Sequence, residues 1–380
     1  MTSPADGTQR LDLPASCDAG HAVQAAQPQS PAIVRIEPAG DLASLRDVWT
    51  ELAQRSGNLF ATWEWAGVWW RHYGEGADPL PLACLDAHGR TVAILALCIE
   101  RVGPMRVARF IGHGPADELG PVCAAADVED AVAALQRAPQ RWNVLLAERL
   151  PGTRAWARAL AGTELHHEAS PVVDVAGLTW DEYLAGRSSN FRSQVRRKER
   201  KLVREHGLEY RLCDDRHRLE ADMGTLFDLH RRRWEDGDSD AFDGARAAFH
   251  RDFAALALER GWLRLWLAEI EGRAVAAWYG FRYGGSEWYY QFGRDPEWDR
   301  SSIGLVLLAH TLREAIGDGV DRYRLLRGGE PYKDRFATSD LGLVTVAVPH
   351  GPSGRAAVSA ARVALRLPAG ARRRVTMRLG

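Results

Sequence analysis

Leu85-Asp-Ala-His-Gly-Arg-Thr-Val-Ala93 and Ala268-Glu-Ile-Glu-Gly-Arg-Ala-Val-Ala276 are the two stretches that decide the fold. Each places Gly-Arg-x-Val-Ala between two apolar, β-prone runs, which predicts a hairpin with a glycine at its turn. The stretches lie 183 residues apart, about half of the 380-residue chain. One short match can arise because hairpins converge on glycine turns, but the elements around both stretches follow a similar order. The sequence therefore favours an internal duplication of an α/β unit.

Apolar periodicity predicts similar elements in both halves of the chain. In the first half it predicts helices over 41–52 (with Asp41 as the N-cap), 60–70 and 127–136, and strands over 33–36, 80–85, 91–99, 107–111 and 142–147. In the second half it predicts helices over 189–206, 219–234, 245–260 and 302–316, and strands over 263–270, 274–283, 286–292 and 322–326. We therefore expect four parts: a disordered leader (1–30), two α/β units (31–175 and 176–350), and a basic, Ala- and Arg-rich tail (351–380).

The composition is that of a globular protein, with 46% hydrophobic residues, 26% charged residues and a net charge of −1. A chain of this length can bury two sizeable cores, and we expect most of its 14 tryptophans to lie in them. No apolar run approaches the roughly 18 residues of a membrane helix, and the leader lacks the pattern of a secretory signal. The dispersed cysteines favour reduced thiols and a cytoplasmic location; they are Cys17, Cys84, Cys98, Cys123 and Cys213.

Several common catalytic motifs are absent from the sequence. It contains no Gly-x-Gly-x-x-Gly after a predicted strand, no Walker Gly-Lys-Ser/Thr, no His-Glu-x-x-His and no Gly-x-Ser-x-Gly. The pair His166-His167 lacks a third ligand at metal spacing, so we expect no metal site. These observations argue against P-loop enzymes, zinc hydrolases and hydrolases with a nucleophilic serine.

The predicted helix over 189–206 is strongly basic. It carries two glutamates and seven cationic side chains. The cations are Arg192, Arg196, Arg197, Lys198, Arg200, Lys201 and Arg204. Spacings of three and four residues gather these charges into two stripes, where they repel one another. A phosphate-bearing ligand or an acidic partner would offset them; a solvated basic helix is the alternative. Arg192 and Arg196 are candidate substrate-binding residues.

The segment Asp299-Arg-Ser-Ser-Ile-Gly-Leu-Val-Leu-Leu308 is a polar turn that runs into an apolar helix. Free backbone N–H groups at a helix N-terminus form an anion site that suits a pyrophosphate. The candidate cofactor-binding residues in this segment are Ser301, Ser302, Ile303, Gly304 and Leu305.

The segment Arg327-Gly-Gly-Glu-Pro-Tyr-Lys-Asp-Arg-Phe336 follows directly after the predicted strand over 322–326. Its glycines allow a sharp turn at a strand end, where α/β folds commonly carry their sites. The segment gathers a carboxylate, a phenol, an ammonium and two guanidinium groups, which can bind anions, stabilise an oxyanion or move a proton. A plain polar loop is the alternative interpretation.

The sequence resembles the GNAT acyltransferases of the CelD-like, FemAB-related group over roughly residues 33–348. The resemblance rests in the first half on Phe60-Ala-Thr-Trp-Glu-Trp65 and Gly112-His-Gly-Pro-Ala-Asp-Glu-Leu-Gly-Pro121. In the second half it rests on the basic helix, on Tyr290-Gln-Phe-Gly-Arg-Asp-Pro296 and on Gly328-Gly-Glu-Pro-Tyr-Lys333. The full GNAT phosphate signature is not present, because the corresponding stretch reads Arg300-Ser-Ser-Ile-Gly304-Leu-Val.

The resemblance implies an α/β (α+β) fold of two tandem GNAT-like units, each a mixed, mostly antiparallel sheet flanked by helices. It implies transfer of an acyl group, usually acetyl, from acyl-CoA to an amine, with an association to polysaccharide or cell-envelope biosynthesis. We then expect Glu330 to act as the base, Tyr332 as the acid, and Lys333 and Arg327 to hold an anionic part of the donor or acceptor. Trp65, Asp117 and Gln291 are expected to bind the acceptor, a small-molecule or glycan-linked amine.

The sequence leaves two other functions open. In the FemAB branch of the resemblance the donor is an aminoacyl-tRNA, and the basic helix and basic tail would then follow its phosphates. The other alternative is a non-catalytic GNAT-like module that binds a partner through its Trp-rich cleft.

Overall fold

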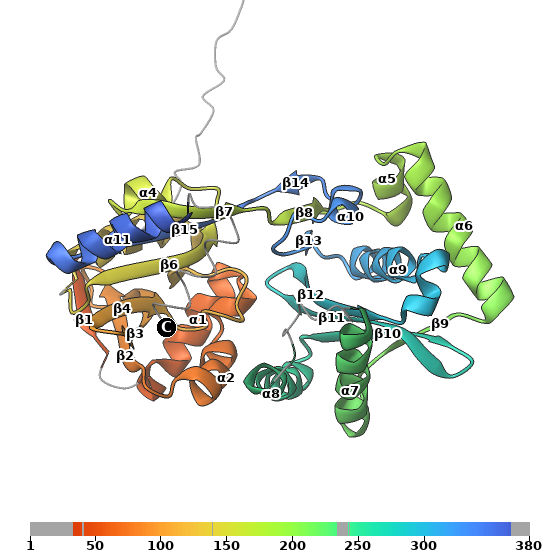
Figure 1. The fold of residues 1–380 in the computed structure, drawn as a ribbon, viewed down its shortest axis with the longest axis horizontal. Coiled ribbons are helices and arrows are strands. Elements are labelled where there is room, and N and C mark those ends of the chain that lie inside the picture. Colours follow the sequence, from red (N-terminus) through yellow and green to blue (C-terminus); the bar gives the residue numbers. More distant parts are fainter. Residues whose placement is uncertain (1–32, 40–41, 139, 234–241, 243, 366–380) are drawn as a thin grey trace, which may run out of the picture. The chain divides into compact units, whose positions relative to one another are not determined.

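The computed structural model describes residues 33–39, 42–138, 140–233, 242 and 244–365 (Figure 1). Within these residues, eight strands form the first sheet, with β1-β2-β3-β4-β6-β15-β7 in order and β5 paired to β3. Their bounds are β1 Arg35–Pro38, β2 Asp78–Leu85, β3 Thr91–Val102, β4 Met105–Phe110, β5 Val122–Cys123, β6 Val144–Pro151, β7 Thr163–Glu168 and β15 Leu343–Pro349.

The second sheet has seven described strands in the order β14-β8-β13-β12-β11-β10-β9. Their bounds are β8 Pro171–Asp174, β9 Glu209–Leu212, β10 Leu263–Ile270, β11 Arg273–Tyr283, β12 Ser286–Arg294, β13 Arg322–Arg324 and β14 Ser339–Asp340. Among the described strand pairs, only β4–β6 and β12–β13 run parallel. Both sheets are therefore mixed and mostly antiparallel, which confirms the predicted fold class.

Helices flank both sheets. In the first half they are α1 Arg46–Ser56, α2 Trp63–Tyr73, α3 Val128–Arg137 and α4 Trp156–Ala159. From there on they are α5 Trp180–Ala185, α6 Ser189–His206, α7 Arg216–Arg233, α8 Ala245–Glu259, α9 Ile303–Gly317, α10 Pro331–Asp334 and α11 Gly351–Leu365. None of the described helices is long and apolar enough to cross a membrane.

The two hairpins that suggested a duplication are present. β2 pairs with β3 across a turn in which Gly89 has φ +75°, and β10 pairs with β11 across one in which Gly272 has φ +71°. Positive φ favours glycine because a Cβ atom would clash with the backbone. The shared Gly-Arg sequence therefore marks the same structural element in both halves.

The two sheets exchange strands (Figure 1). β8 lies before residue 175 but pairs with β13 and β14 of the second sheet. β15 comes from the end of the second half but pairs with β6 and β7 of the first sheet. α11 then packs against β15 and β7. Each sheet thus contains at least one strand from the other part of the sequence.

Some expected elements differ from the structure. The strand expected over 322–326 ends at Arg324, because Leu326 adopts a positive φ of +56° that interrupts an extended strand. No strand had been expected over β7, β8, β9 or β15, nor a helix over α5. The leader, Asp41, Cys17, Trp234 and the tail beyond residue 365 lie outside the described residues, and the four described cysteines are buried free thiols.

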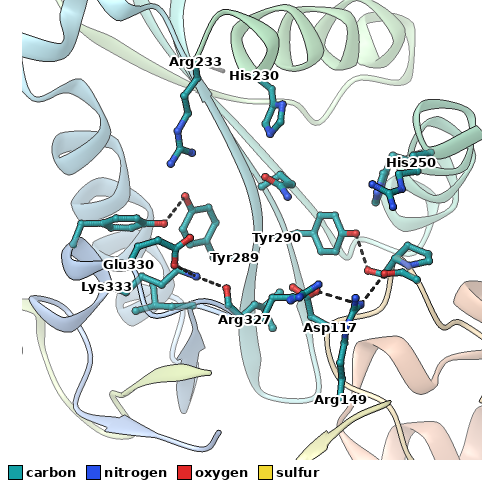
Figure 2. A pocket seen from close by; sticks show the side chains of 17 residues that line it. Asp117, Arg149, His230, Arg233, His250, Tyr289, Tyr290, Arg327, Glu330 and Lys333 are labelled. Atoms are coloured by element: carbon teal, nitrogen blue, oxygen red, sulfur yellow. Dashed lines mark hydrogen bonds and ion pairs between the residues drawn. The ribbon is translucent and has the colours of Figure 1, made fainter. Parts of the chain in front are cut away.

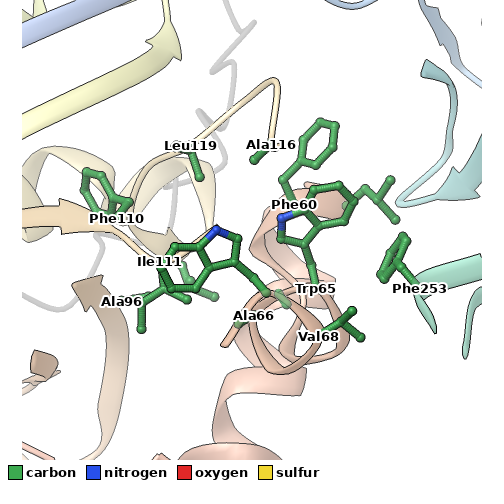
Figure 3. Packing of buried hydrophobic residues seen from close by; sticks show 14 of the residues in the cluster. Phe60, Trp65, Ala66, Val68, Ala96, Phe110, Ile111, Ala116, Leu119 and Phe253 are labelled. Carbon is green, nitrogen blue, oxygen red and sulfur yellow. The ribbon is translucent and has the colours of Figure 1, made fainter. Parts of the chain in front are cut away.

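The largest core contains residues from both halves of the sequence. Trp65 of α2 is fully buried, with its ring against Phe60 on one side and Phe253 of α8 on the other (Figure 3). The Phe60 ring also meets Trp288 of β12. Aromatic rings this large contribute several kcal/mol each when buried. The first half is therefore attached to the second sheet by a continuous apolar core.

Candidate active site

A cavity of the described residues lies where β12 and β13 stop pairing. Their parallel pairing covers Ser286–Trp288 opposite Arg322–Arg324 and ends there. The residues that follow on both strands, 289–291 and 325–327, line a cavity of about 260 Å³ (Figure 2). A register shift opposite Tyr279 and Gly280 leaves one extra residue on β12. Such a bulge re-aims side chains, which explains why Tyr289 and Tyr290 both face the cavity although they are adjacent in a strand.

The first half contributes one wall of this cavity. Gly114, Pro115 and Asp117 come from the loop after β4, and Arg149 comes from β6. The Tyr290 hydroxyl donates to the Pro115 carbonyl oxygen at 2.7 Å, and Arg149 donates to the carbonyl oxygens of Gly114 and Ala116. These bonds tie the loop to β6 and to β12 of the second sheet.

A buried ion pair fixes the same loop further along. Arg324 of β13 donates to Glu118 at 2.7 Å, and both side chains are at least 86% buried. The Arg324 guanidinium also lies 4.3 Å from the centroid of the Trp288 ring, a cation–π contact. The loop that carries Asp117 is therefore held in place against β13.

Lys333 and Glu330 form the end of the cavity next to α10 (Figure 2). Lys333 Nζ donates to the Arg327 carbonyl oxygen at 2.6 Å and lies 3.0 Å from Glu330 Oε2. The Lys333 side chain is 5% exposed, whereas that of Glu330 is 49% exposed. Burial lowers the pKa of Lys333, and the attraction of Glu330 opposes this effect. The ammonium is thus a buried positive charge close to the cavity.

Two tyrosines meet beside this ion pair. Tyr332 donates its hydroxyl to the Tyr289 hydroxyl at 3.3 Å. Burial raises the pKa of both phenols above the ordinary value of 10.0. Tyr332 therefore keeps its proton at neutral pH and can donate it.

Asp117 faces the cavity from the opposite side. It is 8% exposed, and its ion-pair partner is Arg149, whose Nη1 lies 3.9 Å from Oδ1. Burial raises the pKa of the Asp117 carboxyl to about 6, against the attraction of Arg149, Arg327 and Lys333. His250 of α8 lines the same cavity, and burial lowers its pKa to about 3, so its ring is neutral.

Positive charge dominates the cavity wall. The charged lining consists of two carboxylates, Asp117 and Glu330, and five cations, Arg149, Arg233, Arg246, Arg327 and Lys333. Part of this charge is paired, since Arg327 lies 3.1 Å from Glu168 and Arg233 donates to the Phe292 carbonyl oxygen at 3.3 Å. A surplus of cations in a cleft favours ligands with anionic groups.

The structure brings six of the sequence-predicted site residues together in this cavity: Asp117, Gln291, Arg327, Glu330, Tyr332 and Lys333. Trp65 requires a correction, because it lies in the aromatic core instead of facing the cavity. Arg192 and Arg196 are also outside the cavity lining. Arg192 donates to the Arg187 carbonyl oxygen at 2.5 Å, and Arg196 pairs with Asp181 at 2.9 Å on the exposed side of α6.

The predicted phosphate segment lies at the N-terminus of α9. Ser301 ends a 3₁₀ helix over Pro296–Ser301, Ser302 has φ +61°, and α9 starts at Ile303. Gly304 packs toward Phe292, where an added Cβ atom would lie 3.4 Å from the ring. Lys198 of α6 donates to the Arg300 carbonyl oxygen at 3.0 Å. The basic helix therefore lies beside the start of α9, and neither lines the cavity.

Sequence reasoning did not select Arg149, His250, Tyr289 or Tyr290 as site residues. The adjacent tyrosines at the end of β12 were a possible signal, since Gln291 was selected next to them. Arg149 and His250 come from β6 and α8, where no motif marks them. Their place in the site follows only from the packing of the first half against the second sheet. No group of three metal-ligating side chains occurs in the described parts of the chain.

Residues 189–334 match the family model described as the acetyltransferase (GNAT) domain. This match covers 146 of the 380 residues of the chain, less than half of it. The matched segment runs from α6 to α10 and includes Arg327, Glu330, Tyr332 and Lys333. It does not include Asp117 or Arg149. A search of curated proteins finds no significant match.

Solved structures share the fold of this chain at low sequence identity. The crystal structure of FemX matches with a TM-score of 0.58 and 12% identity, over 79% of this chain and 95% of that chain. The C-terminal domain of a protein described as a lysylphosphatidylglycerol synthetase from Agrobacterium fabrum matches with a TM-score of 0.53 and 13% identity, over 84% and 96%. A conserved protein of unknown function from Bacteroides thetaiotaomicron matches with a TM-score of 0.52 and 12% identity, over 82% and 99%. These likenesses extend over both halves and concern the fold.

Proposed function

We propose that this protein is an N-acyltransferase that moves an acyl group, acetyl in the simplest case, from acyl-CoA to an amine in the cavity between β12 and β13. One observation carries the proposal. Within the segment that matches the GNAT domain, the pairing of β12 with β13 ends beside a cavity that is lined by Tyr332, Lys333 and two carboxylates. Separated strands expose backbone groups that can bind an extended acyl-donor arm, and strand ends commonly hold ligands in α/β folds. The buried, reduced cysteines agree with a cytoplasmic reaction.

The cavity provides the groups that amine acylation needs. The amine must lose a proton, the thioester carbonyl must be polarised, and the departing thiolate must gain a proton. Tyr332 has a protonated phenol for the thiolate. Lys333 and Arg327 hold positive charge near an anionic part of donor or acceptor. For the proton of the amine, Glu330 was expected from the sequence, and Asp117 reaches the same cavity from the other half of the chain.

The donor's phosphates would bind outside the cavity, at the start of α9. Residues 301–305 offer backbone N–H groups at a helix N-terminus, which suits a pyrophosphate. Lys198 lies against Arg300 at the same place. The acceptor is proposed to be a small-molecule or glycan-linked amine, as in polysaccharide or cell-envelope biosynthesis. The cations of the cavity favour one that also carries an anionic group.

Thermal-shift measurements with three ligand classes test the proposal. Acetyl-CoA or a longer acyl-CoA should raise the melting temperature in a concentration-dependent way, because a ligand that binds only the folded state stabilises it. The Lys333→Ala variant should lose turnover or substrate affinity. Full turnover with unchanged affinity in that variant would remove Lys333 from the proposed site. Stabilisation by none of the acyl-CoAs and by no tRNA would favour a non-catalytic binding module.

A second candidate, aminoacyl transfer from tRNA, is supported by the surface of α6. Arg196, Arg197, Arg200, Lys201 and Arg204 are all exposed there. Of these, Arg196, Lys201 and Arg204 contact acidic side chains, which offset only part of the charge. A row of exposed cations on one helix can follow a phosphate backbone.

Charge reversal on α6 tests this second candidate. If tRNA is the donor, the combined Arg197→Glu, Arg200→Glu and Lys201→Glu variant should lose tRNA binding. The wild-type affinity should also fall steeply with salt, by about 0.9 logarithmic units or less per phosphate contact and per tenfold change in salt. Arg46→Glu, an exposed change on α1, is the matched control. Unchanged tRNA affinity in the triple variant would rule out α6 as the tRNA surface.

A further inference from the structure

Asp117 is a buried carboxylate that reaches the cavity from outside the GNAT-type domain. We infer that Asp117, not Glu330, takes the proton from the acceptor amine and is a catalytic residue of the reaction. This inference rests on the proposed function, because it names the group that activates the amine in the same cavity. It also gives the loop after β4 a chemical role in addition to its packing role.

The contacts of Asp117 leave its carboxylate open toward the cavity. Among the described residues, no hydrogen bond reaches either of its oxygens, and its one ion-pair partner, Arg149, is 3.9 Å away. Arg149 meanwhile donates to two backbone oxygens of the same loop. Buried polar groups are almost always hydrogen-bonded in folded proteins, and a buried carboxylate without such bonds costs free energy. A group kept in this state beside a cavity is one that a ligand can satisfy.

Glu330 has a different environment. Its carboxylate lies 3.0 Å from the buried Lys333 ammonium, and half of its side chain is exposed. The Glu330 carboxylate is therefore already engaged as the counter-ion of Lys333. Glu330 is therefore better suited to hold Lys333 in place than to accept a proton during turnover. We assign it as a positioning residue for Lys333.

The groups around Asp117 support the same assignment. The charged groups that act on it are Arg149 of β6, Arg327 after β13, Lys333 of α10 and Glu168 of β7. Burial outweighs the attraction of the three cations and raises the Asp117 pKa to about 6. A general base works best when its pKa lies near the working pH. His250, the neutral imidazole in the same cavity, has a pKa of about 3 and is too weak a base.

The proposed reaction has three steps: proton loss from the amine, attack on the thioester, and cleavage of the C–S bond. The acceptor R–NH₃⁺ gives one proton to the Asp117 carboxylate, which leaves R–NH₂ and a neutral carboxylic acid. The amine nitrogen attacks the thioester carbonyl carbon, the C–N bond forms, and the carbonyl oxygen becomes negative. The C–S bond then breaks. The thiolate takes a proton from Tyr332, and the resulting phenolate takes the remaining extra proton from nitrogen. Asp117 releases its proton to solvent, so each turnover yields an amide, a thiol and one H⁺.

The test compares amines that must lose a proton before they can attack the thioester with an amine that is already neutral. The probes are acetyl-CoA with a panel of primary alkyl and sugar amines, which are ammonium ions at neutral pH, and with hydroxylamine, which is already neutral. Release of free thiol is the readout, and product mass confirms the transfer. Asp117→Asn should lower kcat/KM for the ammonium-form amines by about 10²-fold or more, as expected for loss of a general base. It should lower the rate with hydroxylamine far less.

The pH profile and a matched control complete the test. For the wild type, kcat/KM should rise with pH through about 6, where Asp117 ionises; this limb should be missing in Asp117→Asn. Asp47→Asn, an exposed change on α1, should leave the rate unchanged. Equal loss with both kinds of amine, or no loss, would overturn the role of Asp117 and leave the proposed function standing. If the wild type transfers acetyl to no amine and no acyl-CoA stabilises it, the proposed function fails, and this inference fails with it.

Discussion

Asp117→Asn should make the folded protein more stable at neutral pH while it removes activity. Burial raises the Asp117 pKa from 3.8 to about 6 in the folded state. A pKa difference of one corresponds to about 1.4 kcal/mol, so ionisation of Asp117 at neutral pH costs up to about 3 kcal/mol of folding free energy. Asparagine is nearly the same size and carries no charge. Its amide still lacks hydrogen bonds in this site, so we expect a gain of about 1–3 kcal/mol.

The dependence of this gain on pH follows from the raised pKa of Asp117. Between pH 3.8 and about 6, the folded wild type binds more protons at Asp117 than the unfolded chain does. The free energy of unfolding of the wild type therefore falls as pH rises from 3.8 to about 6, and above that pH the destabilisation by ionised Asp117 no longer increases. The variant lacks this contribution. The stability difference between variant and wild type should be near zero at pH 4 and reach its maximum above about pH 6.

Urea unfolding of both proteins at a series of pH values measures this difference. Equal slopes of free energy against urea would show that the comparison concerns stability alone. An Asp117→Asn variant that is less stable than the wild type at pH 7.5, or a difference that does not change with pH, would refute the reasoning. Glu330→Gln serves as a contrast, because the same chemical change leaves the buried Lys333 without its counter-ion. Since Glu330 is half exposed, we expect that variant to lose only about 1 kcal/mol.

Three further substitutions test the frame around the site. Gly328→Ala should lower stability by about 1 kcal/mol or more and lower turnover, because φ is +107° there and the added Cβ atom would lie 2.5 Å from Glu330 Oε2; unchanged kinetics would show that Glu330 is free to move. Arg324→Ala should cost about 3 kcal/mol in urea unfolding, since it leaves Glu118 buried without its partner; a loss below 1 kcal/mol would contradict a tightly held loop. Gly293→Ala should cost about 2 kcal/mol, because its Cβ atom would meet the backbone of α7 at 2.4 Å; an unchanged melting temperature would contradict this close approach.

The sequence predicted those helices and hairpins that are determined by residues close together in the chain. The hairpins at Gly89 and Gly272 follow from glycine turns between β-prone runs. The predicted helix over 189–206 is α6, and in the structure Ser188 caps its start and a left-handed Gly207 follows its end. The exchanged strands β8 and β15 could not be assigned in this way. β15 pairs with β6, which is almost 200 residues earlier in the chain. No local pattern states which sheet such a strand joins.

The site residues also fall into those with a local sequence signal and those placed by long-range packing. Arg327, Glu330, Tyr332 and Lys333 are neighbours in sequence, so a strand end followed by polar residues was enough to select them. Asp117 was selected only through a resemblance, and its proposed role depends on a carboxylate that accepts no hydrogen bond from the described residues. This environment follows from where β6 places Arg149 and from the bonds that hold the loop to β12 and β13. Packing between distant segments created this environment, and a sequence pattern does not encode it directly.

The strand exchange explains how two halves of one chain could both contribute to the proposed reaction. Loops are normally the most mobile parts of a fold, but a proton acceptor must stay within hydrogen-bond reach of its substrate. The Asp117 loop is tied to the second sheet by Tyr290 and Arg324, while β8 and β15 place a strand of each half in the other half's sheet. Separating the halves would require breaking two sheets and one shared core at once. The carboxylate of Asp117 and the phenol of Tyr332 can therefore face one cavity, which residues 189–334 alone could not form.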